Sequence, residues 1–145
     1  MDRIAVKRLR ENAMIPTYGS AEAAGADLYA CLEGAITIAP GETVFVPTGI
    51  AMEVPRGCAG LVFARSSLGA KRGLAPANKV GVIDSDYRGE FFVALHNHGK
   101  LPQEIAHGER IAQLLIVPVF TPGFVEVSEL SDTQRGNGGF GSTGK

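Results

Sequence analysis

Residue types that bind anions and aromatic bases are concentrated near the C-terminal end of the chain. The stretch 135–144 contains five glycines, one arginine, two hydroxyls and one aromatic ring. Glycine lets successive backbone N–H groups form an anion-binding loop. Arg135 can contact a phosphate through two hydrogen bonds, and Phe140 offers a face on which a base can stack. The stretch therefore predicts a nucleotide ligand, whereas a disordered glycine-rich tail is the plainer interpretation.

The segment 81–90 carries the strongest candidate for acid–base chemistry. Asp84 directly follows the apolar residues Gly81–Ile83 and lies three positions before Tyr87. A carboxylate at the end of a strand can act as general base on a water molecule. Asp, Ser and Gly also dominate plain hairpin turns. Tyr87 favours the catalytic interpretation, because an aromatic ring in a turn gains little from burial unless it packs on a partner.

Three further segments offer groups for phosphates or a metal ion. Arg65 ends an apolar run, and Ser66 and Ser67 open a short helix whose N-terminal N–H groups could face an anion; ordinary helix capping explains the same serines equally well. Gln113 lies among apolar residues and needs a polar partner, for which a backbone group is the simpler choice. Asp27 could hold a divalent cation through water, or be an ordinary turn or edge-strand residue.

Composition limits the possible class of protein. The chain has 145 residues, a formal net charge of −1 and 45% hydrophobic residues, which fits one globular domain. With so little net charge we expect no nucleic-acid partner. Cys31 and Cys58 match no metal motif and predict two reduced thiols. The charged N-terminus lacks an apolar signal segment, and no apolar run could span a membrane, so we expect a cytoplasmic protein without a membrane partner.

Turn signals recur about every ten residues, which predicts an all-β sandwich or barrel. The apolar run 110–120 predicts a strand buried on both faces, in part by another subunit. The segment Ser66–Lys71 is the only plausible helix. We expect a catalytic β-body over residues 1–127, with a last strand at 124–127, followed by a flexible arm over residues 128–145.

Taken in chain order, the segments around Asp27, Arg65, Asp84, Gln113 and Arg135 resemble the five motifs of the trimeric dUTPase family. The resemblance implies a β-jelly roll that assembles into a homotrimer. Each active site would lie at a subunit interface, where the arm of one subunit closes over a site formed by the other two. The implied reaction is hydrolysis of dUTP to dUMP and diphosphate with Mg²⁺, which limits uracil incorporation into DNA and supplies dUMP for thymidylate synthesis.

The resemblance also implies roles for individual residues. Asp84 would activate the attacking water, and Tyr87 would pack under the deoxyribose and exclude a 2′-hydroxyl. Asp27 would hold Mg²⁺ through water. Uracil would be bound by Asn78, by the backbone near Val80 and Gly81, and by stacking on Phe140. The phosphates would be contacted by Arg65, Ser66, Ser67, Gln113, Arg135, Gly139, Ser142 and Thr143.

Two other functions fit parts of the pattern. The related dCTP deaminases share the jelly roll and an Arg-Ser-Ser segment, but they need a catalytic Glu and lack the Asp-x-Asp-Tyr hairpin found here at 84–87. A jelly roll can also be a non-enzymatic binding protein. The intact set of Asp84, Tyr87, Arg135 and Phe140 favours an enzyme.

Overall fold

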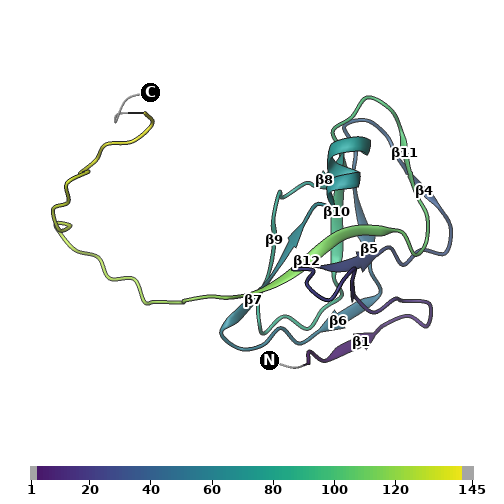
Figure 1. Ribbon diagram of the computed structural model, residues 1–145, viewed down its shortest axis with the longest axis horizontal. Coiled ribbons are helices and arrows are strands. Elements are labelled where there is room, and N and C mark those ends of the chain that lie inside the picture. The colour runs from purple at the N-terminus through teal and green to yellow at the C-terminus, as the bar shows by residue number, and fades with distance from the viewer. Residues whose placement is uncertain (1–2, 142–145) are drawn as a thin grey trace.

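Antiparallel strands make up most of the regular structure in the computed structural model, which describes residues 3–141 (Figure 1). The strands are β1 (Val6–Arg8), β2 (Thr17–Tyr18), β3 (Ala26–Tyr29), β4 (Ile36–Ile38), β5 (Thr43–Pro47), β6 (Ile50–Met52), β7 (Cys58–Phe63), β8 (Leu74–Pro76), β9 (Gly81–Ile83), β10 (Phe92–Asn97), β11 (Gln103–Ile105) and β12 (Arg110–Pro118). Among the described residues the only helical segment is η1 (Ser67–Arg72). The prediction of an all-β fold with one short helix is confirmed.

The largest sheet has the order β2-β3-β12-β7-β9, with β12 at its centre. β12 is rich in aliphatic and β-branched residues, which suit a strand that pairs on both sides. Its register sets Gln113 opposite Asp27 of β3 on one side and Phe63 of β7 on the other. Three segments that are far apart in the sequence therefore meet at the middle of this sheet.

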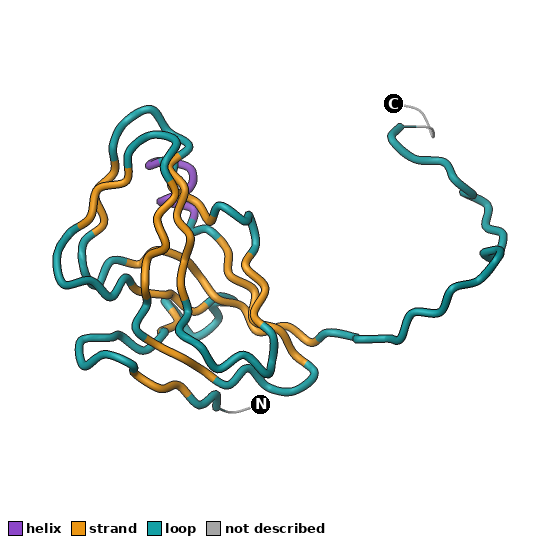
Figure 2. The backbone as a smooth tube through the Cα atoms, turned by 180° about the vertical axis from the view of Figure 1, so that it is seen from behind, coloured by secondary structure: helices purple, strands orange, loops and turns teal. Residues whose placement is uncertain are grey.

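The remaining strands form the sheet β5-β10-β8 and the two pairs β1-β6 and β4-β11. Figure 2 shows how these short strands curl around a common interior. Large side chains with almost no exposed surface fill this interior: Leu28, Ile38, Val46, Ile50, Leu74, Leu95, Ile105 and Ile111. Each such side chain contributes about 1.5–3 kcal/mol by burial, so the loops that carry the polar residues start from a rigid frame.

The helix η1 differs from the prediction at its start. It has π-helical geometry and begins at Ser67, and Ser66 before it already has helical backbone angles (φ −55°, ψ −42°). A capping side chain reaches the free N–H groups from an extended backbone, and Ser66 accordingly makes no capping hydrogen bond. Ser66 thus holds the predicted N-cap position, but its hydroxyl does not cap the helix. The Ser67 hydroxyl instead accepts a hydrogen bond from Arg65 at 3.3 Å.

The chain leaves the folded body after β12 ends at Pro118, and residues 119–141 extend away from it as an arm (Figure 1). The predicted strand at 124–127 is wrong: no strand is assigned there. A strand needs a neighbour to accept its backbone hydrogen bonds, and the body offers none beside the arm. Phe124 is fully exposed and Leu130 is 87% exposed. The predicted domain boundary between residues 127 and 128 stays a prediction.

Two expectations from composition can be compared with the structure. Cys31 and Cys58 are both free thiols, as predicted, with Cys31 buried. Within residues 3–141, no helix has the length and apolar character needed to cross a membrane.

Candidate active site

Asp27 of β3 lies between two arginines at the centre of the large sheet. Its carboxylate Oδ1 accepts a hydrogen bond from Arg65 Nε at 2.8 Å, and Oδ2 lies 3.5 Å from Arg110 Nη1. Asp27 itself is only 9% exposed. Two guanidinium groups against one carboxylate leave this corner of the molecule with an excess of positive charge, which suits an anionic ligand.

The neighbouring side chains set the direction of Arg65. Gln113 Nε2 donates to the carbonyl oxygen of Ala64 at 2.9 Å, which ties β12 to the residue just before Arg65. The predicted backbone partner for Gln113 is therefore confirmed. Gly25 makes room for this amide, since a Cβ at that position would lie 2.9 Å from Gln113 Oε1. The structure thus brings Asp27, Arg65, Ser67 and Gln113 together, with Ser66 next to them at the start of η1.

A second group of predicted residues lies on β9 and on the loop before it. Asn78 is in its turn, where the Val80 N–H donates to the Asn78 carbonyl at 2.7 Å, and Lys79 between them has a left-handed backbone (φ 67°). Gly81 pairs with Val62 of β7. A cleft of about 190 Å³ opens here between β9 and β10, lined by Phe45, Val62, Pro76, Asn78, Gly81, Val82, Ile83, Phe92, Val93 and Ala94. Its apolar walls and single amide suit a small planar ring.

Asp84 and Tyr87 lie in the turn that follows β9. Asp84 is exposed, and its carbonyl accepts a hydrogen bond from the Tyr87 N–H at 3.2 Å. The Tyr87 ring packs against Phe91, with the ring centres 6.1 Å apart, and its hydroxyl donates to the Glu90 carbonyl at 2.9 Å. Tyr87 therefore has a packing partner within the chain, so its position in a turn does not by itself favour the catalytic interpretation.

The third group lies on the arm. Arg135 Nε donates to the Gly138 carbonyl at 2.9 Å, and Phe140, with φ 50°, is fully exposed. Gly139 has no other atom near the place where a Cβ would stand. The predicted phosphate contacts at positions 142 and 143 lie outside the described residues. The arm therefore presents its arginine, glycines and aromatic ring to the surroundings rather than to the body of the same chain.

These three groups do not join within one chain. No hydrogen bond or ion pair found over residues 3–141 connects the Asp27 corner, the loops beside β9 and the arm with one another. The predicted site residues in the described part of the chain therefore stay in three separate groups.

A family model described as dUTPase matches residues 11–144. The chain belongs to the dUTPase family. Deoxyuridine 5'-triphosphate nucleotidohydrolase from Desulfitobacterium hafniense (strain DSM 10664 / DCB-2) is 50% identical over 143 residues, covering 98% of this chain and 95% of that protein. The protein of the same name from Azoarcus sp. (strain BH72) is 49% identical over 148 residues, covering 100% and 99%.

Solved structures of the dUTPase family share the fold of this chain. A mutant of the Staphylococcus bacteriophage 80alpha dUTPase with dUpNHpp superposes with a TM-score of 0.91 at 28% identity, covering 100% of both chains. The dUTPase from phage phi11 of S. aureus gives a TM-score of 0.82 at 25% identity, covering 91% of this chain and 100% of that one. The predicted jelly-roll fold is confirmed by these similarities.

Two residues that lie beside predicted site residues in this member of the dUTPase family were not expected from the sequence. Arg110 reaches Asp27 because a bulge between Arg110 and Ala112 shifts the register of β12 against β3. Glu90 supports Tyr87 through its carbonyl. The only sequence signal for a role of Arg110 was its position three residues before Gln113. In a regular strand, residues at this spacing lie on opposite faces of the sheet, so the contact was not predicted.

Proposed function

We propose that this chain hydrolyses dUTP to dUMP and diphosphate, with Asp84 as the base that activates the attacking water. The observation that carries the proposal is the dUTPase family match over residues 11–144, because this range contains every predicted site residue. The proposal includes the three residue groups described above and an assembly that brings them together.

Asp84 supplies the acid–base step. Its carboxylate is exposed at the end of β9, and no hydrogen bond to it is found among residues 3–141, so it can accept one from a water molecule. A positioned general base contributes about 10²–10⁴-fold to such a reaction. Phosphoryl transfer otherwise depends on alignment and charge neutralisation, so direct attack by water is preferred to a covalent intermediate.

The cleft beside β9 recognises the base and the sugar. The Asn78 amide and the backbone near Val80 and Gly81 would pair with the polar edge of uracil, and Phe140 would stack on the ring. Gly81 has no side chain that would hinder the approach of uracil, and a Cβ there would lie 3.2 Å from Val62 Cβ. Such a narrow site would reject the methyl group of thymine. Tyr87 would pack under the deoxyribose, so a ribose 2′-hydroxyl would meet its ring.

The corner around Arg65 binds phosphates. Arg65 uses Nε for Asp27 and Nη1 for Ser67, while its Nη2 has no hydrogen-bond partner in the described part of the chain. A guanidinium group held in this way is pre-oriented for a phosphate oxygen. Ser66, Ser67 and the second N–H of Gln113 would add hydrogen bonds. The arm would complete the phosphate site through Arg135, Gly139, Ser142 and Thr143.

The dUTPase family depends on a metal ion, and we propose that this chain uses Mg²⁺. The residues fit an ion that is bound mainly by the substrate. Both carboxylate oxygens of Asp27 face arginines, and residues 3–141 contain no group of three His, Cys, Asp or Glu residues that could hold a metal alone. Mg²⁺ commonly keeps several waters and binds through phosphates. Asp27 would orient one of those waters, and the bound ion would neutralise phosphate charge.

A homotrimer would join the three groups, with the arm of one subunit closing over a site formed by the other two. The arm supports this proposal, because it carries exposed apolar side chains and extends away from its own body. Exposed apolar surface of this kind marks an interaction site. Closure would exclude water and align the phosphates.

Mixing two inactive variants tests whether sites are shared between chains. Asp84→Asn keeps the arm, and a chain ending at Gln134 keeps Asp84. In co-expressed heterotrimers about a quarter of the sites would combine an intact base with an intact arm from another subunit, so activity should return to about a quarter of the wild-type value. Recovery of no activity in mixed trimers would show that base and arm act within one chain.

The deciding experiment for the function is a diphosphate-release assay with Mg²⁺ on dUTP, with UTP, dTTP and dCTP in parallel. We expect release from dUTP alone. Absence of release from dUTP by folded protein would overturn the enzymatic function. Ammonia release from dCTP would instead identify a deaminase.

A further inference from the structure

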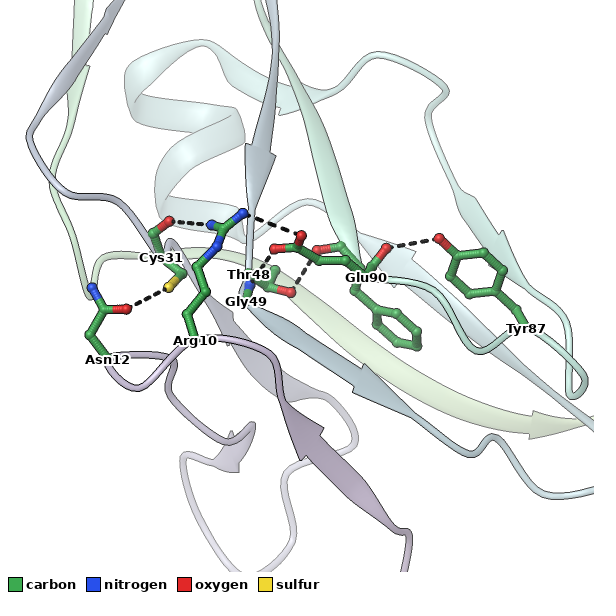
Figure 3. A network of polar contacts seen from close by, with 8 residues as sticks. Arg10, Asn12, Cys31, Thr48, Gly49, Tyr87 and Glu90 are labelled. Atoms are coloured by element: carbon green, nitrogen blue, oxygen red, sulfur yellow. Dashed lines mark hydrogen bonds and ion pairs between the residues drawn. The ribbon is translucent and has the colours of Figure 1, made fainter.

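Glu90 connects the loop between β9 and β10, which carries Tyr87, to a distant part of the chain (Figure 3). Its carboxylate Oε1 accepts a hydrogen bond from the Gly49 N–H at 2.9 Å, and Oε2 pairs with Arg10 Nη2 at 3.3 Å. The Glu90 side chain is only 15% exposed. A partly buried carboxylate with a charged and a neutral donor is held more firmly than one in an exposed ion pair.

The groups that hold Glu90 are themselves fixed. Arg10 also donates from Nη1 to the Cys31 carbonyl at 3.2 Å. Gly49 has φ 69°, and a Cβ there would lie 2.7 Å from Cys31 Sγ, so only glycine places this N–H without strain. Thr48 before it donates its hydroxyl to the Phe91 carbonyl at 2.6 Å. Segments 10–12, 31 and 48–49 therefore form one platform under Glu90.

The platform fixes the position of Tyr87 through a hydrogen bond to the backbone and through ring packing. The Glu90 carbonyl accepts the Tyr87 hydroxyl, and the neighbouring Phe91 ring supports the Tyr87 ring. Gly89 lets the ring fold back, because a Cβ there would lie 2.6 Å from Tyr87 Cζ. The direction of Tyr87 thus depends on where residues 90–91 are anchored. Asp84, at the other end of the turn, depends instead on the pairing of β9 with β7.

We propose that Glu90, anchored by Arg10 and the Gly49 N–H, is a positioning residue that sets the orientation of Tyr87 and thereby the discrimination between deoxyribose and ribose. The proposal rests on the proposed function for the role of Tyr87. Glu90 acts through Tyr87 and does not itself touch the substrate. Loss of the anchor loosens the contact of Tyr87 with the sugar, while the general base Asp84 and the strand β9 before it stay in place.

Kinetics of the full-length protein test the proposal. For Glu90→Ala we expect the ratio of kcat/KM for dUTP to that for UTP to fall about tenfold, mainly through a higher KM for dUTP, with kcat within about threefold of wild type. Glu90→Gln keeps an acceptor for the Gly49 N–H and loses the ion pair, so we expect a fall of about threefold. This second variant decides the question if Glu90→Ala does not fold.

Glu53→Ala is the matched control. Glu53 also pairs with an arginine of the same loop, Arg88, but at 3.8 Å and with 62% of the Glu53 side chain exposed. We expect its sugar discrimination to equal that of wild type. A wild-type ratio in folded Glu90→Ala or Glu90→Gln would overturn the proposal, as would an equal loss on both sugars, which would indicate a merely structural role.

A second readout does not depend on catalysis. The ring signals of Tyr87 in an NMR spectrum should shift in Glu90→Ala, because the ring moves relative to Phe91, and should stay in place in Glu53→Ala. Unmoved signals in Glu90→Ala would overturn the positioning role. If wild-type protein releases no diphosphate from dUTP, the proposed function fails while this signal still tests the positioning.

Discussion

The folded body and the C-terminal arm of this chain differ in how far their apolar side chains are exposed. In the body, over residues 3–118, aliphatic side chains such as Leu95 and Ile105 are completely buried. In the arm, Phe120, Phe124 and Phe140 are almost entirely exposed although they are larger and equally apolar. The body encloses a core of its own, although Phe45 and Leu101 stay 70% exposed, whereas the described part of the arm has no buried apolar side chain.

This difference fits the division of roles proposed above. A general base and a side chain that contacts the sugar have to be positioned within a fraction of an ångström. The paired strands on either side of Asp84 and Tyr87 can provide this precision. A closing element has to move between states, so it needs a segment with few contacts of its own. The glycines and Arg135 on the arm meet that need. The two regions therefore suit different steps of one reaction.

The largest expected effect is the loss of the base supplied by the body. Asp84→Asn should lower diphosphate release from dUTP by about 10³-fold, because the amide cannot accept the proton of the attacking water. Binding of dUTP, measured by calorimetry, should be nearly unchanged, since Asp84 is assigned no contact with base or phosphate. Full residual activity in this variant would remove the general-base role and break the division between body and arm.

A smaller effect is expected from the arm. Deletion of residues 135–145 should lower activity by about 10²-fold through loss of closure and phosphate contacts. The melting temperature should stay at the wild-type value, because no part of the folded core is removed. If the rate is unchanged after deletion, the arm is the disordered tail of the plainer interpretation.

The smallest effect concerns the first part of the arm. Phe124→Ser should weaken self-association by about tenfold, because an exposed aromatic ring is a strong anchor in an interface. Sedimentation at several protein concentrations measures this change. Leu130→Ala serves as a comparison farther along the arm. A wild-type association constant for Phe124→Ser would show that this ring has no partner in the assembly.

Much of the fold was predictable because the signals were local. Turn signals predicted the all-β class, and the apolar run 110–120 located β12, since alternation and β-branching act within each strand. The short strands β8 and β11 carry no such run. β8 contains Pro76 and β11 contains two polar residues, Gln103 and Glu104. Their backbone becomes extended through pairing with distant strands, β10 and β4, which no local pattern reports.

The contacts of the predicted site residues were only partly predictable. Gln113 was expected to need a backbone partner, and it donates to Ala64. Asp27 was expected to face a metal-bound water, and its carboxylate is held by Arg65 and Arg110. The contact of Arg110 with Asp27 depends on a bulge in β12. The extra residue of such a bulge was not predicted from the sequence.

The sequence by itself determined the residue types, their order and the family, because the motifs are short and each is carried by consecutive residues. Tertiary structure decided which of them touch. Asp27 meets an arginine 83 positions away, and Glu90 meets one 80 positions away. Such contacts follow from strand register and burial summed over the whole body, and they exist only once the loops between them are closed. For the same reason residues 120–141 extend away from the body of their own chain.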